Sequence, residues 1–244
     1  LRKWNSENRS NLFDTTTYTY IEKQFRKYLI PKYSTNTEVD IGNKMFYGRS
    51  KIESIFCSRK SDSKIYYRIG GGRYWKIFLN FQPRFILNDI ESISSRENHL
   101  FFNEPELRDA SISILSSSLF FMYFIVTTNG RDLNPYDLNE FPVDFISMKK
   151  KNINSLSKLN KILMIDYRTN SKTKNKVSKI TGNIEYEEYY PKYSKPIIDS
   201  IDTILAEHYC FSEDELDFII NYDIKYRMGT ELRAYTDGTL AKRK

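Results

Sequence analysis

Residues 64–79 have the sequence KIYYRIGGGRYWKIFL, in which two runs of branched and aromatic residues flank Gly70, Gly71 and Gly72. Such runs favour β-strands, and a short glycine-rich link between them is typical of an antiparallel hairpin. A phosphate-binding loop has a helix after its glycines, whereas a second strand follows here. We therefore predict a hairpin at 64–79, followed by a short strand at 84–87.

An apolar stripe predicts the longest helix of the first half of the chain. It begins near Pro105, keeps apolar residues at every third to fifth position from Leu107 to Tyr123, and ends at the Gly130 cap. Residues 119–126 within it are apolar all round. A helix end of this kind is either buried on all sides or in contact with another domain.

The C-terminal part predicts a pair of helices. Apolar residues lie at helical spacing from Ile197 to His208, and Ser212 with Glu215 forms a capping box ahead of a second apolar stripe. A further helix is expected at residues 20–28. The fold class is therefore α+β, with a mixed β-sheet in the first half, packed helices, and a helical C-terminal part.

Charge and pattern divide the chain into three predicted parts. Residues 1–145 hold the hairpin and the long helix, residues 146–195 form a basic loop or linker segment, and residues 196–244 form a helical subdomain. Within the basic segment, residues 170–179 are polar and rich in lysine, which predicts a mobile loop.

The composition favours a folded protein with a polyanionic partner. Hydrophobic residues make up 40% of the chain and charged residues 28%, and the formal net charge is +7 at pH 7. A basic chain gains affinity for nucleic acid because neutralising phosphates releases condensed counterions. The aromatic share of 15% suits stacking at wet surfaces, although the codons of an AT-rich genome produce much of the same excess.

The start of the chain and its apolar runs predict a soluble, cytoplasmic protein without a membrane partner. The polar start, Leu1 to Trp4, does not resemble a signal peptide, and the longest apolar run, residues 119–126, is too short to span a bilayer. The first residue is not methionine, so we expect a fragment of a longer protein.

The sequence contains no pattern that predicts a catalytic centre or a metal site. His99, His208, Cys57 and Cys210 are too few and too scattered for a zinc site or a Ser–His–Asp set, and we interpret His208 and Cys210 as packing residues. Residues 134–137, Asn-Pro-Tyr-Asp, are similar to the Asn-Pro-Pro-Tyr tetrad of amino-methyltransferases. They follow a helix cap, however, and no glycine-rich methyl-donor motif precedes them.

With no catalytic or metal-binding pattern in the sequence, the function that its residues favour is binding to a nucleic acid. Cations pair with phosphates or with guanine edges, and exposed rings stack on bases. The hairpin at 64–79 interleaves such cations and rings, so one interpretation is that it contacts nucleic acid. In the alternative interpretation, Tyr74 or Trp75 packs in the core, and Arg68 and Arg73 are ordinary surface residues. The candidate DNA-binding residues are Arg68, Arg73, Tyr74, Lys76, Arg131, Lys149, Lys150, Lys151, Lys172, Lys174 and Lys176.

Several sequence blocks resemble the C-terminal region of one bacterial enzyme family. The blocks are IIDSID (197–202), LAEHY (205–209), the stretch 212–223, SSSLFFMYF (116–124), GRDLN (130–134), Phe-Pro (141–142), and the two strands of the predicted hairpin (65–68 and 73–75). Together they are similar to the target-recognition region of adenine-specific DNA methyltransferases of restriction–modification systems. This family includes the fused type IIG restriction enzymes with TaqI-like specificity domains.

The resemblance implies sequence-specific recognition of double-stranded DNA. In the family, an upstream domain binds S-adenosylmethionine and methylates an adenine flipped out of the duplex, while the region similar to this chain grips the flanking duplex. The methyl-donor motif and the Asn-Pro-Pro-Tyr tetrad are missing here. We therefore expect no cofactor in this chain, with S-adenosylmethionine bound in a catalytic domain that the chain lacks. The expected partners are duplex DNA and the upstream methyltransferase domain of the same polypeptide.

Two other classes of function are compatible with the sequence. One is a module that binds RNA or single strands, supported by the richness in tyrosine and lysine. The other is a protein-interaction subunit that docks through residues 119–126 and the acidic C-terminal helices. The salt dependence of binding separates nucleic-acid binding from protein docking. A phosphate-binding face gives a steep slope of log affinity against log salt concentration, and a hydrophobic interface gives a shallow one.

Overall fold

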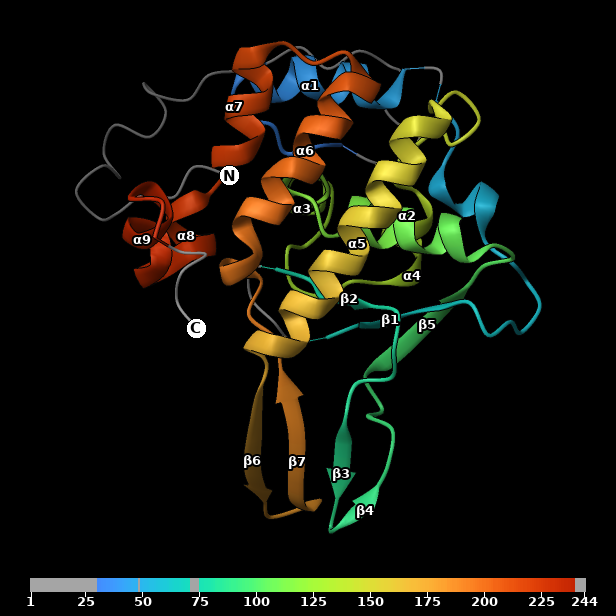
Figure 1. Ribbon diagram of the computed structural model, residues 1–244, viewed down its shortest axis with the longest axis vertical. Helices are drawn as coiled ribbons and strands as arrows, with labels where there is room; N and C mark the ends of the chain where they lie inside the picture. Colours follow the sequence, from blue (N-terminus) through green and yellow to red (C-terminus); the bar gives the residue numbers. More distant parts are fainter. Residues whose placement is uncertain (1–29, 48, 71–74, 240–244) are drawn as a thin grey trace.

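The computed structural model describes residues 30–47, 49–70 and 75–239. The fold is α+β, as predicted: a body of helices encloses a small sheet, and a second sheet projects from one end of the body (Figure 1). Every strand pair that the structure describes is antiparallel, so neither sheet is mixed. The helix predicted at 20–28 lies outside the described residues, as do Arg73 and Tyr74.

The helices belong to the body and the strands divide between the two sheets. The α-helices are α1 (Asn36–Phe46), α2 (Pro105–Leu115), α3 (Ser118–Thr127), α4 (Pro135–Asn139), α5 (Lys150–Asn170), α6 (Lys195–Tyr209), α7 (Glu213–Asn221), α8 (Ile224–Met228) and α9 (Leu232–Thr236). Short 3-10 helices lie at η2 (Ile52–Ile55), η3 (Pro191–Ser194) and η4 (Gly229–Glu231). The strands are β1 (Lys64–Arg68), β2 (Phe78–Leu79), β3 (Phe85–Leu87), β4 (Ile90–Glu91), β5 (Glu97–Phe101), β6 (Lys172–Ser178) and β7 (Gly182–Glu188).

The predicted pairing within residues 64–79 is present, but its second strand is short. Strand β1 pairs antiparallel with β2 and with β5, and Tyr67 lies opposite Phe78. Residues 75–77 are not in a strand. Lys76 instead places its ammonium group against the Arg131 carbonyl at 2.6 Å, so its side chain points into the body.

The single helix predicted from Pro105 to residue 129 is wrong, because it is two helices. Helices α2 and α3 meet at an angle of 65°. At the break, the Ser117 hydroxyl accepts a hydrogen bond from the Phe120 amide at 3.0 Å and donates one to the Ile114 carbonyl at 2.6 Å. A serine side chain that satisfies backbone groups in this way begins a new helix as readily as it continues an old one.

Helix α3 lies inside the protein. This confirms the first of the two predicted alternatives for residues 119–126, burial on all sides rather than contact with another domain. The side chains of Leu119 through Phe124 are at most 3% exposed. Among the described residues, no single helix has the length and apolarity to cross a membrane, and α2 with α3 meets that test only as a bent pair. The apolar run thus serves as core and is not available as a docking surface.

The basic segment (146–195) contains a long helix and a hairpin of two strands, β6 and β7, so the predicted loop at 170–179 is wrong. Helix α5 has 21 residues and packs along α2, where the Ser113 hydroxyl donates to the Leu156 carbonyl at 2.7 Å. Its buried side includes Asn152, Ser157 and Asn160. These polar residues interrupt the apolar stripe, which is why the periodicity of the sequence did not predict the helix.

One hydrophobic core contains residues from all three predicted parts of the chain. It extends from Ile41 of α1 through Leu163 of α5 to Ile219 of α7. The predicted C-terminal helix pair is confirmed as α6 and α7, and the Ser212–Glu215 capping box is formed. Each part therefore contributes side chains to the same interior.

A buried group of charges connects the C-terminal helices to α3. Asp202 of α6 is 2% exposed and accepts hydrogen bonds from the amides of Ser118 and Leu119 at 2.9 and 3.3 Å. Arg227 of α8 donates to the Ser118 hydroxyl at 2.5 Å, with its guanidinium 4.5 Å from the centre of the Trp75 ring. Burial raises the pKa of Asp202 to about 6, while the Ser118 hydrogen bond and the Arg227 charge act in the opposite direction.

We predict that Asp202→Ala lowers the free energy of unfolding by about 3–5 kcal/mol. The reason is that the substitution leaves the amides of Ser118 and Leu119 buried without their acceptor and removes the negative charge that offsets the burial of Arg227. Urea denaturation followed by circular dichroism measures the change. Asp40→Ala, at an exposed position of α1, is the control and should change stability by less than about 0.5 kcal/mol. Equal losses in the two variants would contradict the structural role of Asp202.

His208 packs as predicted, whereas Cys210 does not. The His208 ring lies 4.9 Å from the centre of the Tyr209 ring, and its Nε2 lies 3.2 Å from Nη1 of Arg49. Cys210 is exposed and ends α6 in the left-handed conformation with φ of 57°. Burial, and then the Arg49 charge, lower the pKa of His208 to about 4.

Stability should fall as the pH decreases from about 6.5 to about 4, because over this range the unfolded chain binds a proton that the folded His208 resists. The loss attributable to His208 is about 1–3 kcal/mol after allowance for its partial exposure to solvent. Urea midpoints of the wild type and His208→Gln at pH 7 and pH 4.5 measure it. The variant should lose less stability than the wild type, and parallel pH profiles would disprove the assignment.

Candidate functional site

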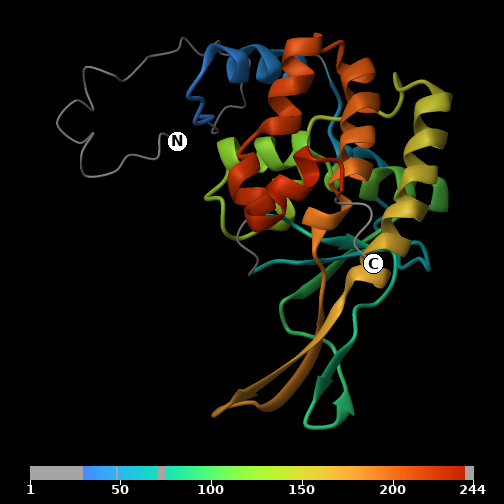
Figure 2. The same cartoon turned by 60° about the vertical axis from the view of Figure 1, so that its left-hand side comes forward.

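The sheet that projects from the body is the most distinctive surface of the protein. Its strand order is β4-β3-β7-β6, and we call it the protruding sheet (Figures 1 and 2). Phe85 and Leu87 of β3 lie opposite Tyr186 and Ile184 of β7, and β7 pairs along its whole length with β6. Every residue of these four strands is exposed or half-buried, so both faces of the sheet reach solvent.

One face of the protruding sheet carries a row of lysines. Lys172, Lys174 and Lys176 alternate along β6, so they point to the same face at intervals of about 6.8 Å. Their cross-strand neighbours on that face are Glu188, Tyr186 and Ile184, respectively. We call these three residues the lysine row; all three are exposed. The alternation is visible in the sequence, but the three charges are aligned on one face only because residues 172–178 form a strand.

The opposite face holds most of the acidic side chains of β7. Glu185 and Glu187 lie opposite Asn175 and Thr173 of β6. Arg84, next to β3, approaches Glu185 with an N–O distance of 2.8 Å. The sheet therefore separates its charges, with the lysine row on one face and two of the three glutamates of β7 on the other.

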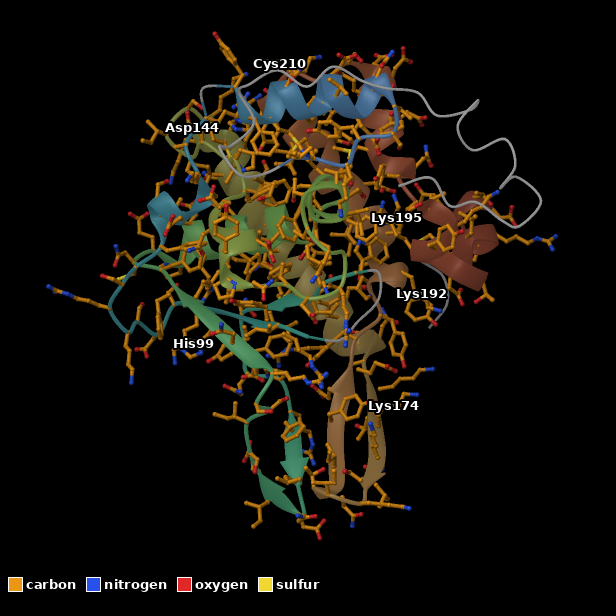
Figure 3. The ribbon with its side chains drawn as sticks, turned by 180° about the vertical axis from the view of Figure 1, so that it is seen from behind. His99, Asp144, Lys174, Lys192, Lys195 and Cys210 are labelled. Atoms are coloured by element: carbon orange, nitrogen blue, oxygen red, sulfur yellow. The ribbon has the colours of Figure 1, made fainter. Side chains whose placement is uncertain are left out.

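The third glutamate of β7 shares the face of the lysine row and has two partners there. Glu188 lies 3.7 Å from Nζ of Lys174 and also accepts a hydrogen bond from the Tyr190 hydroxyl. Burial, and then the hydrogen bond to Glu188, raise the pKa of Tyr190 to about 12, so this hydroxyl keeps its proton. Figure 3 shows Lys174 on the sheet and Lys192 farther up, where the sheet joins the body.

A cleft of about 380 Å³ lies at the root of the protruding sheet, between it and the sheet of the body. Tyr66, Trp75 and Tyr186 contribute to its aromatic lining, and Glu97 and Arg68 to its charged lining. Burial raises the pKa of Glu97, against the opposing effects of the Gln82 hydrogen bond and the Arg68 charge. We call this space the root cleft.

The predicted binding residues on and near the hairpin have different environments. Arg68 is exposed at the end of β1 and borders the root cleft, opposite Glu97 of β5. Arg131 is 85% exposed at its side chain. Lys76 is only 7% exposed, with its ammonium 4.9 Å from the centre of the Phe124 ring. Burial lowers the pKa of Lys76. We therefore exclude Lys76 from the candidate surface.

Lys149, Lys150 and Lys151 lie at the far end of α5 from the lysine row. Helix α5 has 21 residues, which corresponds to a length of roughly 30 Å. Lys149 and Lys151 both pair with Glu207, at 2.9 and 3.0 Å, and Lys150 pairs with Glu106 at 2.6 Å. The structure thus separates two lysine triplets that the sequence suggested as parts of one basic segment.

Other contacts that shape the candidate surface have no signal in the sequence. Asn88, in the turn between β3 and β4, accepts a hydrogen bond from the Asn183 amide at 2.8 Å, so it ties together two turns that are far apart in the chain. Arg168, at the end of α5, stacks over Phe81 with its guanidinium 3.8 Å from the ring centre. Both contacts hold the protruding sheet in place, and both depend on tertiary structure.

Two of the patterns considered in the sequence are located by the structure: candidate metal-ligating side chains and the tetrapeptide 134–137. No group of three or more His, Cys, Asp or Glu side chains among these residues could hold a metal ion. Residues 134–137 form a helix start, where Asp137 accepts hydrogen bonds from the backbone and side chain of Asn134 at 2.9 and 3.0 Å. This tetrapeptide begins α4, whereas its place after a helix cap suggests a turn.

Comparison of the chain with protein-family models, curated protein sequences and solved structures returns no match.

We predict that Gly182→Ala loosens the end of the protruding sheet. Gly182 has φ of +82°, and a Cβ there would lie 2.1 Å from Oδ1 of Asn88. Hydrogen exchange should show reduced protection at the backbone amides of Asn88 and Asn183, each of which donates a hydrogen bond to the other residue. Gly238→Ala, also at positive φ but with open space around it, is the control and should leave both amides protected. Unchanged protection of these two amides in Gly182→Ala would contradict the role of Gly182 in the contact between Asn88 and Asn183.

Proposed function

We propose that this chain recognises double-stranded DNA for a restriction–modification adenine methyltransferase whose catalytic domain lies outside the chain. The lysine row on the protruding sheet is the observation that carries the proposal. The resemblance of the sequence blocks to target-recognition regions supplies the biological context, and the physical argument follows from the shape and charge of the sheet.

The shape of the protruding sheet suits a groove of a duplex. The major groove of B-DNA is about 12 Å wide and admits a two-stranded β-ribbon, and ribbons of this kind read DNA in either groove. Strands β6 and β7 have seven residues each and form a two-stranded edge of the protruding sheet, which projects from the helical body (Figure 2), while β3 pairs with the other side of β7.

The charge pattern of the ribbon suits a phosphate backbone. Each DNA strand carries one charge for about every 3.4 Å of helix axis, so a lysine at about every 6.8 Å corresponds to every second phosphate. The separation of Glu185 and Glu187 onto the opposite face leaves a predominantly positive face toward the duplex. This separation of charges also orients the sheet on a duplex, because the DNA phosphates would repel the face that carries Glu185 and Glu187.

The two alternative functions find less support in the structure. Among the described tyrosines, the most exposed are Tyr47, Tyr136 and Tyr226. These three lie on the helical body rather than on the protruding sheet, so they do not form a stacking platform beside the lysine row. Seven of the eight apolar residues 119–126, which a protein-docking subunit would expose, are buried, and Ile125 is half-buried. Duplex DNA therefore accounts for the exposed chemistry best.

In this proposal, the body and the protruding sheet have different tasks. Lys172, Lys174 and Lys176 neutralise phosphates, Arg131 and Arg68 extend the basic surface toward the body, and the upstream domain of the same polypeptide holds S-adenosylmethionine and performs methyl transfer. Phosphate contacts set the position of the protein on DNA, while base contacts set its sequence preference. The three-lysine row thus belongs to positioning rather than to base reading.

We predict that replacing Lys172, Lys174 and Lys176 with glutamine weakens duplex binding and reduces the dependence of log affinity on log salt. The slope should decrease by up to about 2.7, or about 0.9 for each phosphate that the variant no longer neutralises. Fluorescence anisotropy with a 30-base-pair duplex at a series of salt concentrations measures the slope. A single strand of the same sequence, tested beside it, should bind more weakly than the duplex.

The control is the triple glutamine variant of Lys149, Lys150 and Lys151. It lowers the formal net charge of +7 by the same three units, but at the other end of α5. Its salt slope should stay close to that of the wild type, and thermal unfolding confirms that both variants fold. Equal slopes in the two variants would mean that only net charge matters, and absence of duplex binding by the wild type at low salt would overturn the proposal.

A further inference from the structure

The far end of the protruding sheet exposes large apolar side chains. Ile180, in the turn between β6 and β7, is 94% exposed, and Val177 beside it is 79% exposed. Ile90 of β4, in the neighbouring hairpin, is 69% exposed. Isolated exposed isoleucines are common on proteins, but Ile180 occupies the turn of the β6–β7 hairpin close to Val177, while Ile90 lies on β4 at the other edge of the sheet.

The turn that carries Ile180 has internal hydrogen bonds that hold its shape. The Ser178 hydroxyl accepts a hydrogen bond from the Ile180 amide at 3.3 Å and another from the Thr181 amide at 3.2 Å. Such serine-centred turns limit the backbone conformations that the residues between them adopt. Ile180 is therefore presented from an ordered turn.

A second hairpin braces this turn from the side. The Asn88 side-chain amide donates to the Thr181 carbonyl at 3.2 Å, its Oδ1 accepts from the Asn183 amide at 2.8 Å, and its backbone amide donates to the Asn183 carbonyl at 2.9 Å. Gly182, between these contacts, leaves no room for a Cβ. The conformational entropy of the turn is thus already reduced before any partner binds, which favours the use of the tip in binding.

The charges around the apolar tip indicate which partner it meets. Lys176 and Lys179 flank it within the same hairpin, and Lys174 continues the positive row toward the body. Apolar side chains flanked by cations are the combination that DNA-bending proteins insert between base pairs, since the cations hold the phosphates on each side while the wedge separates the bases. A protein partner with an apolar groove would not require this row of lysines.

We propose that Ile180 is an apolar wedge that enters a groove of duplex DNA and unstacks one base step. This inference rests on the proposed function, since it requires the lysine row to place the ribbon on a duplex. It adds a local distortion of DNA to the positioning role of the lysines. A recognition region that unstacks a base step assists any reaction on a base that must leave the helix.

Two 30-base-pair duplexes test the wedge by their relative affinities. One is fully paired, and the other has the same sequence with a single unpaired nucleotide at its centre, where stacking is already weakened. Because the wild type would spend less free energy on opening the second duplex, we expect it to bind that duplex roughly tenfold more tightly. A 2-aminopurine beside the central step should become more fluorescent when the protein binds, as it does when a base is unstacked.

Ile180→Asn should abolish both effects and leave the salt slope of binding unchanged. Ile146→Asn is the matched control, because Ile146 is 91% exposed but belongs to the helical body. It should retain the preference and the fluorescence change. The triple glutamine variant of the lysine row should bind both duplexes more weakly while keeping the ratio of their affinities.

The outcomes separate the wedge from the proposed function. In one outcome, the wild type binds duplex DNA with a steep salt slope and shows no preference for the unpaired nucleotide. That result disproves the unstacking role of Ile180 but leaves the proposed DNA binding intact. A preference that survives in Ile180→Asn overturns the wedge in the same way. If the wild type binds neither duplex, the proposed function fails and the wedge fails with it.

Discussion

The carboxylate of Asp202 is the group on which the arrangement of the helical body depends. It accepts hydrogen bonds from the first amides of α3, just after the bend between α2 and α3, and the positive charge of Arg227 acts on it. Burial destabilises both ions, and each charge offsets part of that cost for the other: Asp202 raises the pKa of Arg227, and Arg227 lowers the pKa of Asp202. Helix α3 is thereby fixed in position, and the sheet of the body packs on it through the edge-to-face contact of Phe78 with Phe120, whose ring centres are 5.7 Å apart.

The stiffness of the body continues into the protruding sheet. Helix α5 packs along α2 and is followed within two residues by β6, so the orientation of the ribbon is set by a helix anchored in the core. At the root, Arg168 stacks on Phe81, and Phe81 lies 6.2 Å from Tyr189. The sheet has no core of its own, and these contacts explain how it keeps a defined direction while both its faces remain in solvent. A rigid projection of this kind presents its side chains with little loss of entropy on binding.

The candidate surface is a small part of what the basic sequence suggested. Of the predicted binding residues, Lys172, Lys174 and Lys176 form an aligned row, while Lys76 is part of the core and the lysines at the start of α5 are paired with glutamates. Sequence composition records how many cations exist, but their usefulness depends on exposure and on neighbouring carboxylates. The proposals for DNA binding and for the wedge at Ile180 both arise from this arrangement, in which cations and exposed apolar residues share one hairpin.

The sequence by itself determined the features that depend on near neighbours: the α+β class, the pairing of β1 with β2, and the helix pair α6 and α7 with its capping box. These follow from side-chain periodicity and from caps formed within a few residues. Tertiary structure alone decided that α5 is a helix despite its polar stripe, that Lys76 is buried, and that β3 pairs with β7. Arg84 and Glu185, which meet across that pairing, are 101 residues apart. Contacts over such a separation depend on packing in the whole core, and no local pattern of residues encodes them.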